Sequence, residues 1–112
     1  MSKKLLIVWS TAEVEVAKKM VLLYASVILE RGYFDEAHLM IWGPSAKVLC
    51  ENSELQEMLK KVQKSGVTTS ACVVCSDDYG VTQKLQVLGV ETNHTGELLT
   101  EALLGDYKIL TF

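Results

Sequence analysis

The sequence predicts an α/β protein of three layers (α/β/α), in which a mainly parallel, five-stranded β-sheet lies between helices. Five short segments are rich in branched and aromatic apolar residues, a pattern typical of strands buried inside a sheet. Segments with helical features separate these strands, and a glycine ends several of the helices. Because strands and helices alternate along the chain, right-handed crossovers between parallel strands are expected.

The first strand is expected at residues 5–9, where LLIVW is a continuous apolar run. Ser10 and Glu13 then form a capping-box pattern, which predicts a helix that continues to about Glu30. Its second half, MVLLYASVIL, is apolar nearly all round, whereas a helix that covers one face of a sheet needs only one apolar stripe. The surplus predicts that residues 21–29 also contact another subunit.

The middle of the chain repeats the alternation. A second strand is expected at residues 37–42, followed by a short helix at 44–50 whose proline suits the first helical turn. Ser53 and Gln56 form a second capping-box pair, which predicts a helix to about residue 64.

The last part of the chain also reads as alternating elements, and its first strand is β-branched. The expected elements are a strand at 67–72, a connection at 77–80, a short helix ending at 88, a strand at 90–95, a helix at 97–104 and a strand at 107–112.

The composition restricts the function classes. A chain of 112 residues is expected to form a single domain, residues 1–112. Its composition, with 49% hydrophobic and 22% charged residues, is typical of a soluble globular protein. A net charge of −3 argues against a nucleic-acid partner. No segment approaches the ~20 apolar residues of a membrane span, and the first apolar run is too short for a signal peptide. We therefore expect a cytoplasmic protein with reduced cysteines and no membrane partner.

Residues that could take part in catalysis or binding lie where the predicted strands end, which is where ligands bind in open α/β sheets. The strand ends carry Trp9, Ser10, Trp42, Gly43, Cys72 and His94, and Asp78 and Tyr79 follow soon after Cys72. The tryptophans could line a pocket or pack in the core, and a lone histidine is often only a satisfied polar residue. Neither a G-x-G-x-x-G nor a P-loop pattern is present, so no nucleotide cofactor is expected.

Cys72 and Cys75, in ACVVCSDDYG, have the C-x-x-C spacing of metal sites and redox couples. Zinc needs four ligands, and only Cys50 and His94 remain, neither of which forms a tight motif with the pair. No metal site is expected. A thioredoxin-like couple stays open, although the usual aromatic residue before the first cysteine is absent.

Cys72 is the better candidate for a reactive thiol. A cysteine at a strand-to-helix junction lies near backbone N–H groups that favour the thiolate. Asp77 and Asp78 oppose this effect, because nearby negative charge disfavours a second anion. A buried, inert cysteine is the alternative.

The segment GVTTSACVVCSDDYGV resembles the cysteine segment of the DsrE/DsrF-like (TusD-like) family of sulfur-relay-related proteins. In that segment a Gly-Val pair leads into a strand and a cysteine, and a second Gly-Val or Gly-Ile follows eight residues beyond the cysteine. Here the positions are Gly66-Val67, Cys72 and Gly80-Val81. The opening strand and helix, GELLTEALL and DYKILTF also look like the family, so the resemblance spans nearly the whole chain.

The resemblance implies a flavodoxin-like sheet, for which we expect the strand order 2-1-3-4-5, and assembly as a homo-oligomer, often a trimer or hexamer. It also implies that Cys72 carries sulfur as a persulfide, taken from a donor protein and passed to an acceptor without a metal or organic cofactor. Cys75 could resolve this persulfide. Relay members often have basic residues where Asp78 and Tyr79 stand here.

Many family members have no assigned activity, so three function classes stay open. The chain could be a sulfur carrier that uses Cys72, a non-catalytic oligomeric protein that binds a small ligand or partner, or a dithiol redox protein that uses Cys72 and Cys75.

Overall fold

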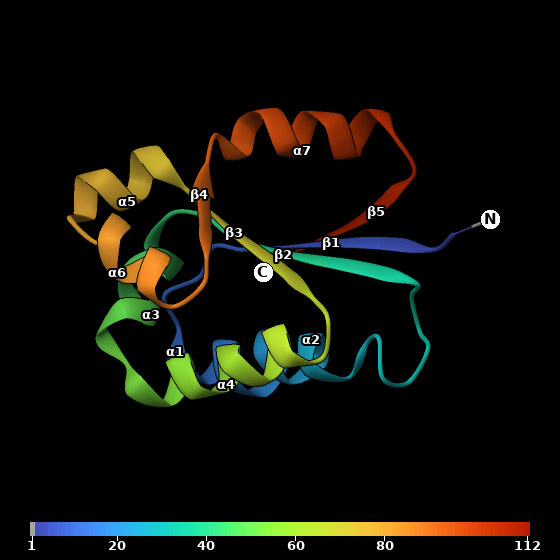
Figure 1. Ribbon diagram of the computed structural model, residues 1–112, viewed down its shortest axis with the longest axis horizontal. Helices are drawn as coiled ribbons and strands as arrows, with labels where there is room; N and C mark the ends of the chain where they lie inside the picture. Colours follow the sequence, from blue (N-terminus) through green and yellow to red (C-terminus); the bar gives the residue numbers. More distant parts are fainter. Residues whose placement is uncertain (1) are drawn as a thin grey trace.

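Five parallel strands form one sheet in the computed structural model, which describes residues 2–112 (Figure 1). The strands are β1 Lys4–Trp9, β2 Glu36–Ile41, β3 Thr68–Cys72, β4 Glu91–Asn93 and β5 Tyr107–Thr111. All five lie where the sequence predicts strands. The α/β fold class, with a parallel five-stranded sheet, is confirmed.

The order of the strands across the sheet is β4-β3-β2-β1-β5, so the predicted order 2-1-3-4-5 is wrong. β1 pairs with β2 on one side and with β5 on the other, where Leu6 lies opposite His38 and Ile109. The chain therefore crosses the sheet in one direction from β1 to β4 and then returns to place β5 beside β1. Local sequence patterns locate strands, but they do not encode pairings between such distant segments.

This path explains the layers of the molecule. Right-handed crossovers place all connecting helices on the same face while the chain advances in one direction. That face carries α1 Val14–Val16, the π-helical segment η1 Ala17–Val21, α2 Leu22–Val27, α3 Pro44–Glu51, α4 Ser53–Lys64 and α6 Thr82–Val87. When the direction reverses after β4, the connecting helix α7 (Thr95–Leu104) covers the opposite face (Figure 1).

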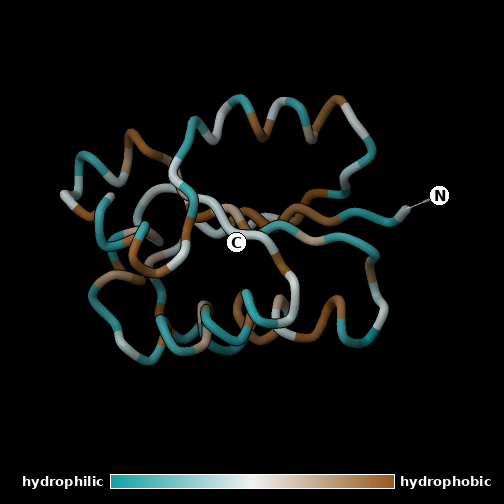
Figure 2. The backbone as a smooth tube through the Cα atoms, in the orientation of Figure 1, coloured by the Kyte–Doolittle hydropathy of each residue, from teal (hydrophilic) through white to brown (hydrophobic). Residues whose placement is uncertain are grey.

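The sheet separates two cores of unequal size. In β1, Leu5, Ile7 and Trp9 belong to the larger core under α1–α4, whereas Leu6 and Val8 belong to the smaller core under α7. This alternation follows from the two-residue period of a strand. Figure 2 shows hydrophobic stretches along the central strands and, alternating with hydrophilic ones, along the helices. The face of the sheet under α7 is therefore the more thinly covered one.

The predicted helix over residues 10–30 is shorter and is interrupted by η1. Ser10 does not cap it, because the Ser10 hydroxyl donates a hydrogen bond to the Phe112 carbonyl at 2.8 Å. The backbone N–H of Glu13 donates instead to Thr11 Oγ1 at 3.0 Å. Ser10 thus fastens the end of β5 rather than a helix.

The second capping box is also absent. Asn52, one residue earlier than predicted, caps α4, and its Oδ1 accepts a hydrogen bond from the Leu55 N–H at 3.0 Å. Gln56 Nε2 donates to the Leu49 carbonyl at 3.0 Å, so it joins α4 to the end of α3. Ser53 lies inside the helix.

The apolar surplus of residues 21–29 is largely buried within the chain itself. Val21, Leu22, Ala25 and Ile28 are buried in the larger core, and α2 packs against α4 as well as the sheet. Leu23 is an exception, with 54% of its surface exposed. The second apolar side of this helix is therefore covered, in part, by another helix of the same chain.

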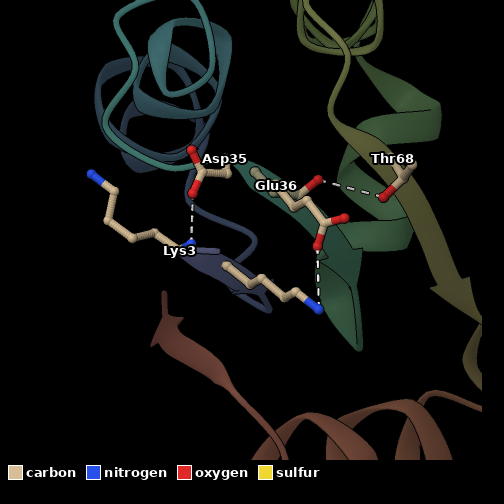
Figure 3. A network of polar contacts seen from close by, with 6 residues as sticks. Lys3, Asp35, Glu36 and Thr68 are labelled. Atoms are coloured by element: carbon tan, nitrogen blue, oxygen red, sulfur yellow. Dashed lines mark hydrogen bonds and ion pairs between the residues drawn. The ribbon is translucent and has the colours of Figure 1, made fainter. Parts of the chain in front are cut away.

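Polar contacts join the amino ends of the strands, far from the edge where the strands end (Figure 3). The Lys3 backbone N–H donates to Asp35 Oδ2 at 2.7 Å, and Lys4 Nζ lies 3.5 Å from Glu36 Oε2. The Thr68 hydroxyl donates to a backbone carbonyl of β2 at 3.4 Å. Exposed contacts of this kind contribute little stability individually. They connect the amino ends of β1, β2 and β3 with one another.

His38 lies on the α7 face of β2, between two hydroxyl groups of β3. Its Nδ1 is 2.6 Å from Thr68 Oγ1, and its Nε2 is 2.7 Å from Ser70 Oγ. Burial lowers the pKa of His38 below its ordinary value of 6.5, and the charge of Glu91 only partly opposes this. The neutral imidazole therefore fits the folded protein better than the imidazolium.

We expect His38 to make the protein less stable in acid. Because its pKa is lower in the folded state, the unfolded chain takes up the proton first as the pH falls. Its stabilising effect is complete above pH 6.5 and is lost as the pH falls through the folded-state pKa. Urea unfolding near neutral pH and near pH 5 should show a smaller loss of stability in acid for His38→Gln than for the parent. An unchanged pH dependence in His38→Gln would contradict this role.

Between residues 2 and 112, none of the helices has both the length and the apolar character required to cross a bilayer.

Candidate functional site

Cys72 ends β3 and is the N-cap residue of α5 (Val73–Tyr79). Its Sγ accepts a hydrogen bond from the backbone N–H of Cys75 at 3.4 Å. The stretch 77–80, expected to be a connection, is instead the second half of α5 and its C-terminal cap. Gly80 makes this possible, because it adopts the left-handed backbone conformation (φ 70°) that glycine favours. The sulfur of Cys72 thus takes the place of the oxygen acceptor that usually caps a helix.

A solvent-open cavity of about 880 Å³ lies beside Cys72. The connection after β3 returns through α6 on the α4 side, whereas the connection after β4 leaves on the α7 side. Adjacent strands whose connections leave on opposite faces create a crevice at their carboxyl ends. The cavity is lined by Trp42, Cys72, Val74, Cys75, His94, Thr95, Gly96, Glu97, Thr100 and Glu101.

The structure brings together four of the residues that the sequence singled out. Cys72, Cys75, Trp42 and His94 all line the cavity. Gly43 does not line the cavity, but its backbone lowers the pKa of Cys75 against the other influences on that thiol. Gly43 also has a positive φ of 76°, so a glycine suits the turn that leads from β2 into α3.

Four other predicted pocket residues lie outside the cavity. Trp9 has no exposed surface and belongs to the larger core, where its indole N–H donates to the Thr11 carbonyl at 3.0 Å. Ser10 is bonded to the end of β5. Asp78 and Tyr79 are exposed on the last turn of α5. The two tryptophans differ because Trp9 pairs with Ile41, which places Trp42 one residue farther on and on the opposite face.

Hydrogen bonds favour the thiolate of Cys72. Burial alone would raise the pKa of this thiol. The backbone N–H of Cys75, the Thr95 hydroxyl, the Cys75 side chain and the Val74 N–H together outweigh burial, and they lower the pKa of Cys72 below its ordinary value. Neither Asp77 nor Asp78 is among these influences, and the Asp77 carboxylate accepts a hydrogen bond from Thr82 instead.

The other two thiols are less acidic. Burial and a hydrogen bond with Cys72 raise the pKa of Cys75, the Gly43 backbone opposes this, and the charges of Cys72 and Asp78 add to the rise. Cys50 is only 2% exposed, and burial raises its pKa as well. All three cysteines are free thiols. The geometry therefore distinguishes Cys72 as the most acidic of the three.

The first half of α7 forms the wall of the cavity that sequence reasoning missed. Thr95 begins this helix, and its side chain is 1% exposed. Glu97 and Glu101 follow at a spacing of four residues, so they lie on the same side of the helix. The signal was present in TGELLTEALL, which directly follows the fourth strand.

Metal ligation is not apparent at this site. Within the described part of the chain, no three His, Cys, Asp or Glu side chains gather in a way that could hold a metal ion. The residues around Cys72 can instead support thiolate chemistry in an open, partly acidic cavity.

Comparisons with known proteins agree with this architecture. The model of the DsrE/DsrF-like family matches residues 3–112. A solved structure described as a conserved protein of unknown function, BT1422 from Bacteroides thetaiotaomicron, is 30% identical, with a TM-score of 0.94 over 98% of this chain and 95% of that one. The ychN protein from E. coli is 20% identical, with a TM-score of 0.68 over 100% of both chains, and so shows the fold alone.

No curated protein matches the chain in the sequence comparison. The family assignment depends on the family model, which covers nearly all residues, and on the Bacteroides structure, which is similar over almost the whole length of both chains. The chain belongs to the DsrE/DsrF-like family.

Proposed function

We propose that the protein is a sulfur carrier that accepts persulfide sulfur on Cys72. The observation that carries this proposal is the position of the Cys72 sulfur. It accepts a hydrogen bond from the Cys75 N–H at 3.4 Å and lies beside an open cavity. Cys72 is buried, with 6% of its surface exposed, but it lines the open cavity. A thiol with a lowered pKa at the wall of such a cavity has the properties of a nucleophile. Membership of a family that includes sulfur-relay proteins supports the same assignment.

The transfer follows ordinary thiol chemistry. The Cys72 thiolate attacks the outer sulfur of a donor persulfide, a new S–S bond forms at Cys72, and the donor leaves as a thiolate. An acceptor thiolate can later attack the outer sulfur on Cys72 in the same way. The Cys75 N–H and the Thr95 hydroxyl stabilise negative charge on Cys72 before and after each transfer. The donor and acceptor are expected to be proteins of a sulfur relay.

Sulfur loading tests the proposal directly. After incubation with a cysteine desulfurase and cysteine, the parent should gain the mass of one sulfur atom, and peptide masses should place it on Cys72. Cys72→Ser should abolish the gain, because it removes the attacking thiolate. Cys50→Ser is the matched control and should load normally, since Cys50 is buried away from the cavity. Loading that persists in Cys72→Ser would contradict the proposal.

A dithiol couple is the second candidate, favoured by two thiols that line the same cavity and shift each other's pKa. Such a couple would lose two hydrogens reversibly when treated with a disulfide oxidant, and peptide masses would join Cys72 to Cys75. Cys75→Ser should prevent this loss but still accept sulfur if the first proposal holds. If neither product forms, a non-catalytic role in binding a small ligand or partner replaces both.

We also propose that the protein self-associates as a trimer or hexamer through an apolar face beside α2. Met20 and Leu23 are 51% and 54% exposed, and Tyr33 and Leu110 are 45% and 39% exposed. These residues line one shallow hollow of about 550 Å³. Exposed apolar side chains that gather in one place are typical of protein–protein contacts.

Leu23→Glu should therefore weaken the assembly. A charge at the centre of an apolar contact costs ~2 kcal/mol or more, which weakens association by about 30-fold. Light scattering at micromolar concentration should show a larger monomer fraction. Val87→Glu is the control, because Val87 is 82% exposed on α6 but lies away from the hollow. A monomeric parent at this concentration would overturn the proposal.

A further inference from the structure

The cavity beside Cys72 has an acidic wall. Glu97 and Glu101 are exposed and lie one turn apart on α7, and neither belongs to an ion pair with the residues that the structure describes. Among the residues that the structure describes, no lysine or arginine lines the cavity. The two carboxylates therefore favour a ligand with positive charge and disfavour an anionic one.

Trp42 forms an aromatic wall of the same cavity. One part of its side chain packs against the smaller core under α7, and the half-buried ring also lines the cavity. The face of an indole ring attracts ammonium groups more strongly than the faces of other aromatic side chains do. An aromatic ring and two carboxylates thus border one open space.

Thr95 supplies an unfilled hydrogen-bonding position in this wall. Its side chain is 1% exposed, and its hydroxyl has no hydrogen-bond partner among residues 2–112. The same hydroxyl favours the thiolate form of Cys72 over the thiol. A buried hydroxyl without a partner is unfavourable, so a ligand atom beside Cys72 gains a hydrogen bond there.

We propose that this cavity binds small thiols, disulfides and persulfides that carry an ammonium group. The ammonium lies between the Trp42 ring and the carboxylates of Glu97 and Glu101, and the ligand's sulfur lies beside Cys72 and the Thr95 hydroxyl. The proposal adds a class of small-molecule sulfur donors to the protein donor of the sulfur carrier, and it rests on Cys72 being the reacting thiol. An aminothiol persulfide, R–S–SH, loses its outer sulfur to the Cys72 thiolate and leaves as R–S⁻, so no oxidant or reductant is needed.

Thiol–disulfide exchange with charged reagents tests this selectivity. Cys75→Ser serves as the background, so that the mixed disulfide on Cys72 is not resolved. The reagents are cystamine, which is cationic, bis(2-hydroxyethyl) disulfide, which is neutral, and 3,3′-dithiodipropionate, which is anionic. Each rate is measured from intact masses. It is then divided by the rate at which the same reagent reacts with a small reference thiol, and this division corrects for the different intrinsic reactivities of the reagents. Exchange transfers R–S to Cys72 and releases R–S⁻.

We expect the normalised rate with cystamine to exceed the rate with the anionic reagent by about tenfold or more, as electrostatic steering allows. Glu97→Gln/Glu101→Gln should reduce this ratio to about threefold or less. Glu13→Gln/Glu30→Gln is the matched control, because it removes the same charge from exposed positions outside the cavity. If the control lowers the ratio as much as the cavity variant does, or if the parent shows no preference, the proposal is overturned.

A second measurement is independent of the reactivity of Cys72. In Cys72→Ser, 2-(methylthio)ethylamine, an unreactive thioether analogue, should shift the indole N–H resonance of Trp42, which Trp42→Phe identifies. The anionic analogue 3-(methylthio)propionate should not shift it. A shift with the amine, combined with a parent protein that fails to load sulfur, would support the cavity proposal and refute the sulfur carrier. No shift, or equal shifts with both compounds, would overturn the cavity proposal even if sulfur loads normally.

Discussion

Replacing Trp9 by alanine is expected to lower the free energy of unfolding by about 3–5 kcal/mol. The side chain has no exposed surface and lies in the larger core, so truncation leaves a cavity there and removes the hydrogen bond to the Thr11 carbonyl. Because small domains are stable by only about 5–15 kcal/mol, this loss is a large fraction of the total. Urea unfolding monitored by circular dichroism measures it.

Trp42 supplies the comparison for this prediction. It is half-buried and borders the cavity, so Trp42→Ala should destabilise the protein less than Trp9→Ala does. Trp9→Phe should retain most of the stability, because it preserves much of the buried volume. A smaller decrease in the free energy of unfolding for Trp9→Ala than for Trp42→Ala would contradict the burial of Trp9 in the core.

We expect the three thiols to react at widely different rates near neutral pH. The thiolate is the reactive form, and each unit of pKa changes its population by about tenfold while the thiol is mostly protonated. Cys72 has the lowered pKa, whereas the pKa values of Cys75 and Cys50 are raised. Both Cys50 and Cys72 are buried, at 2% and 6% exposed, but only Cys72 lines the open cavity, so the Cys72 rate should exceed the Cys50 rate by about 100-fold or more.

Peptide masses over a time course with iodoacetamide measure these rates. Unfolding in urea is the control, because it should bring the three rates close together. Asp78→Asn should speed the alkylation of Cys75, whose pKa Asp78 raises, and should leave Cys72 unchanged. Alkylation of Cys50 at the rate of Cys72 in the folded protein would refute the proposed difference in reactivity.

The strands were predictable because each one is a short run of apolar or β-branched residues between turn signals. The run at residues 5–9 needed no knowledge of its partners. Strand order was not predictable in this way, since the pairing of Val8 with Thr111 joins residues about a hundred positions apart. The prediction of the helix caps failed for a related reason. Ser10 matches a local capping pattern, but the end of β5 takes its hydroxyl.

The candidate site was predictable in part. A strand end next to a helix start placed Cys72 correctly at the carboxyl edge, and the same logic found Trp42 and His94. Trp9 was wrongly placed in the pocket. Successive residues of a strand lie on alternate faces of the sheet, and the pairing of Trp9 with Ile41 puts Trp9 on the face opposite to Trp42. Thr95, Glu97 and Glu101 were missed because α7 reaches Cys72 only through a crossover on the opposite face.

The single helix on the thinly covered face has a consequence for local opening and amide hydrogen exchange. Only Thr95 and Ala102 of α7 are buried, and β5 has no buried residue along its length. The unit formed by α7 and β5 should therefore open at a lower free energy than strands β1–β3, which carry buried residues, and exchange its amides faster. Each opening removes one wall of the cavity and leaves Cys72 in place on β3. A ligand that touches both walls binds only the closed form, so its presence should slow exchange throughout α7 and β5.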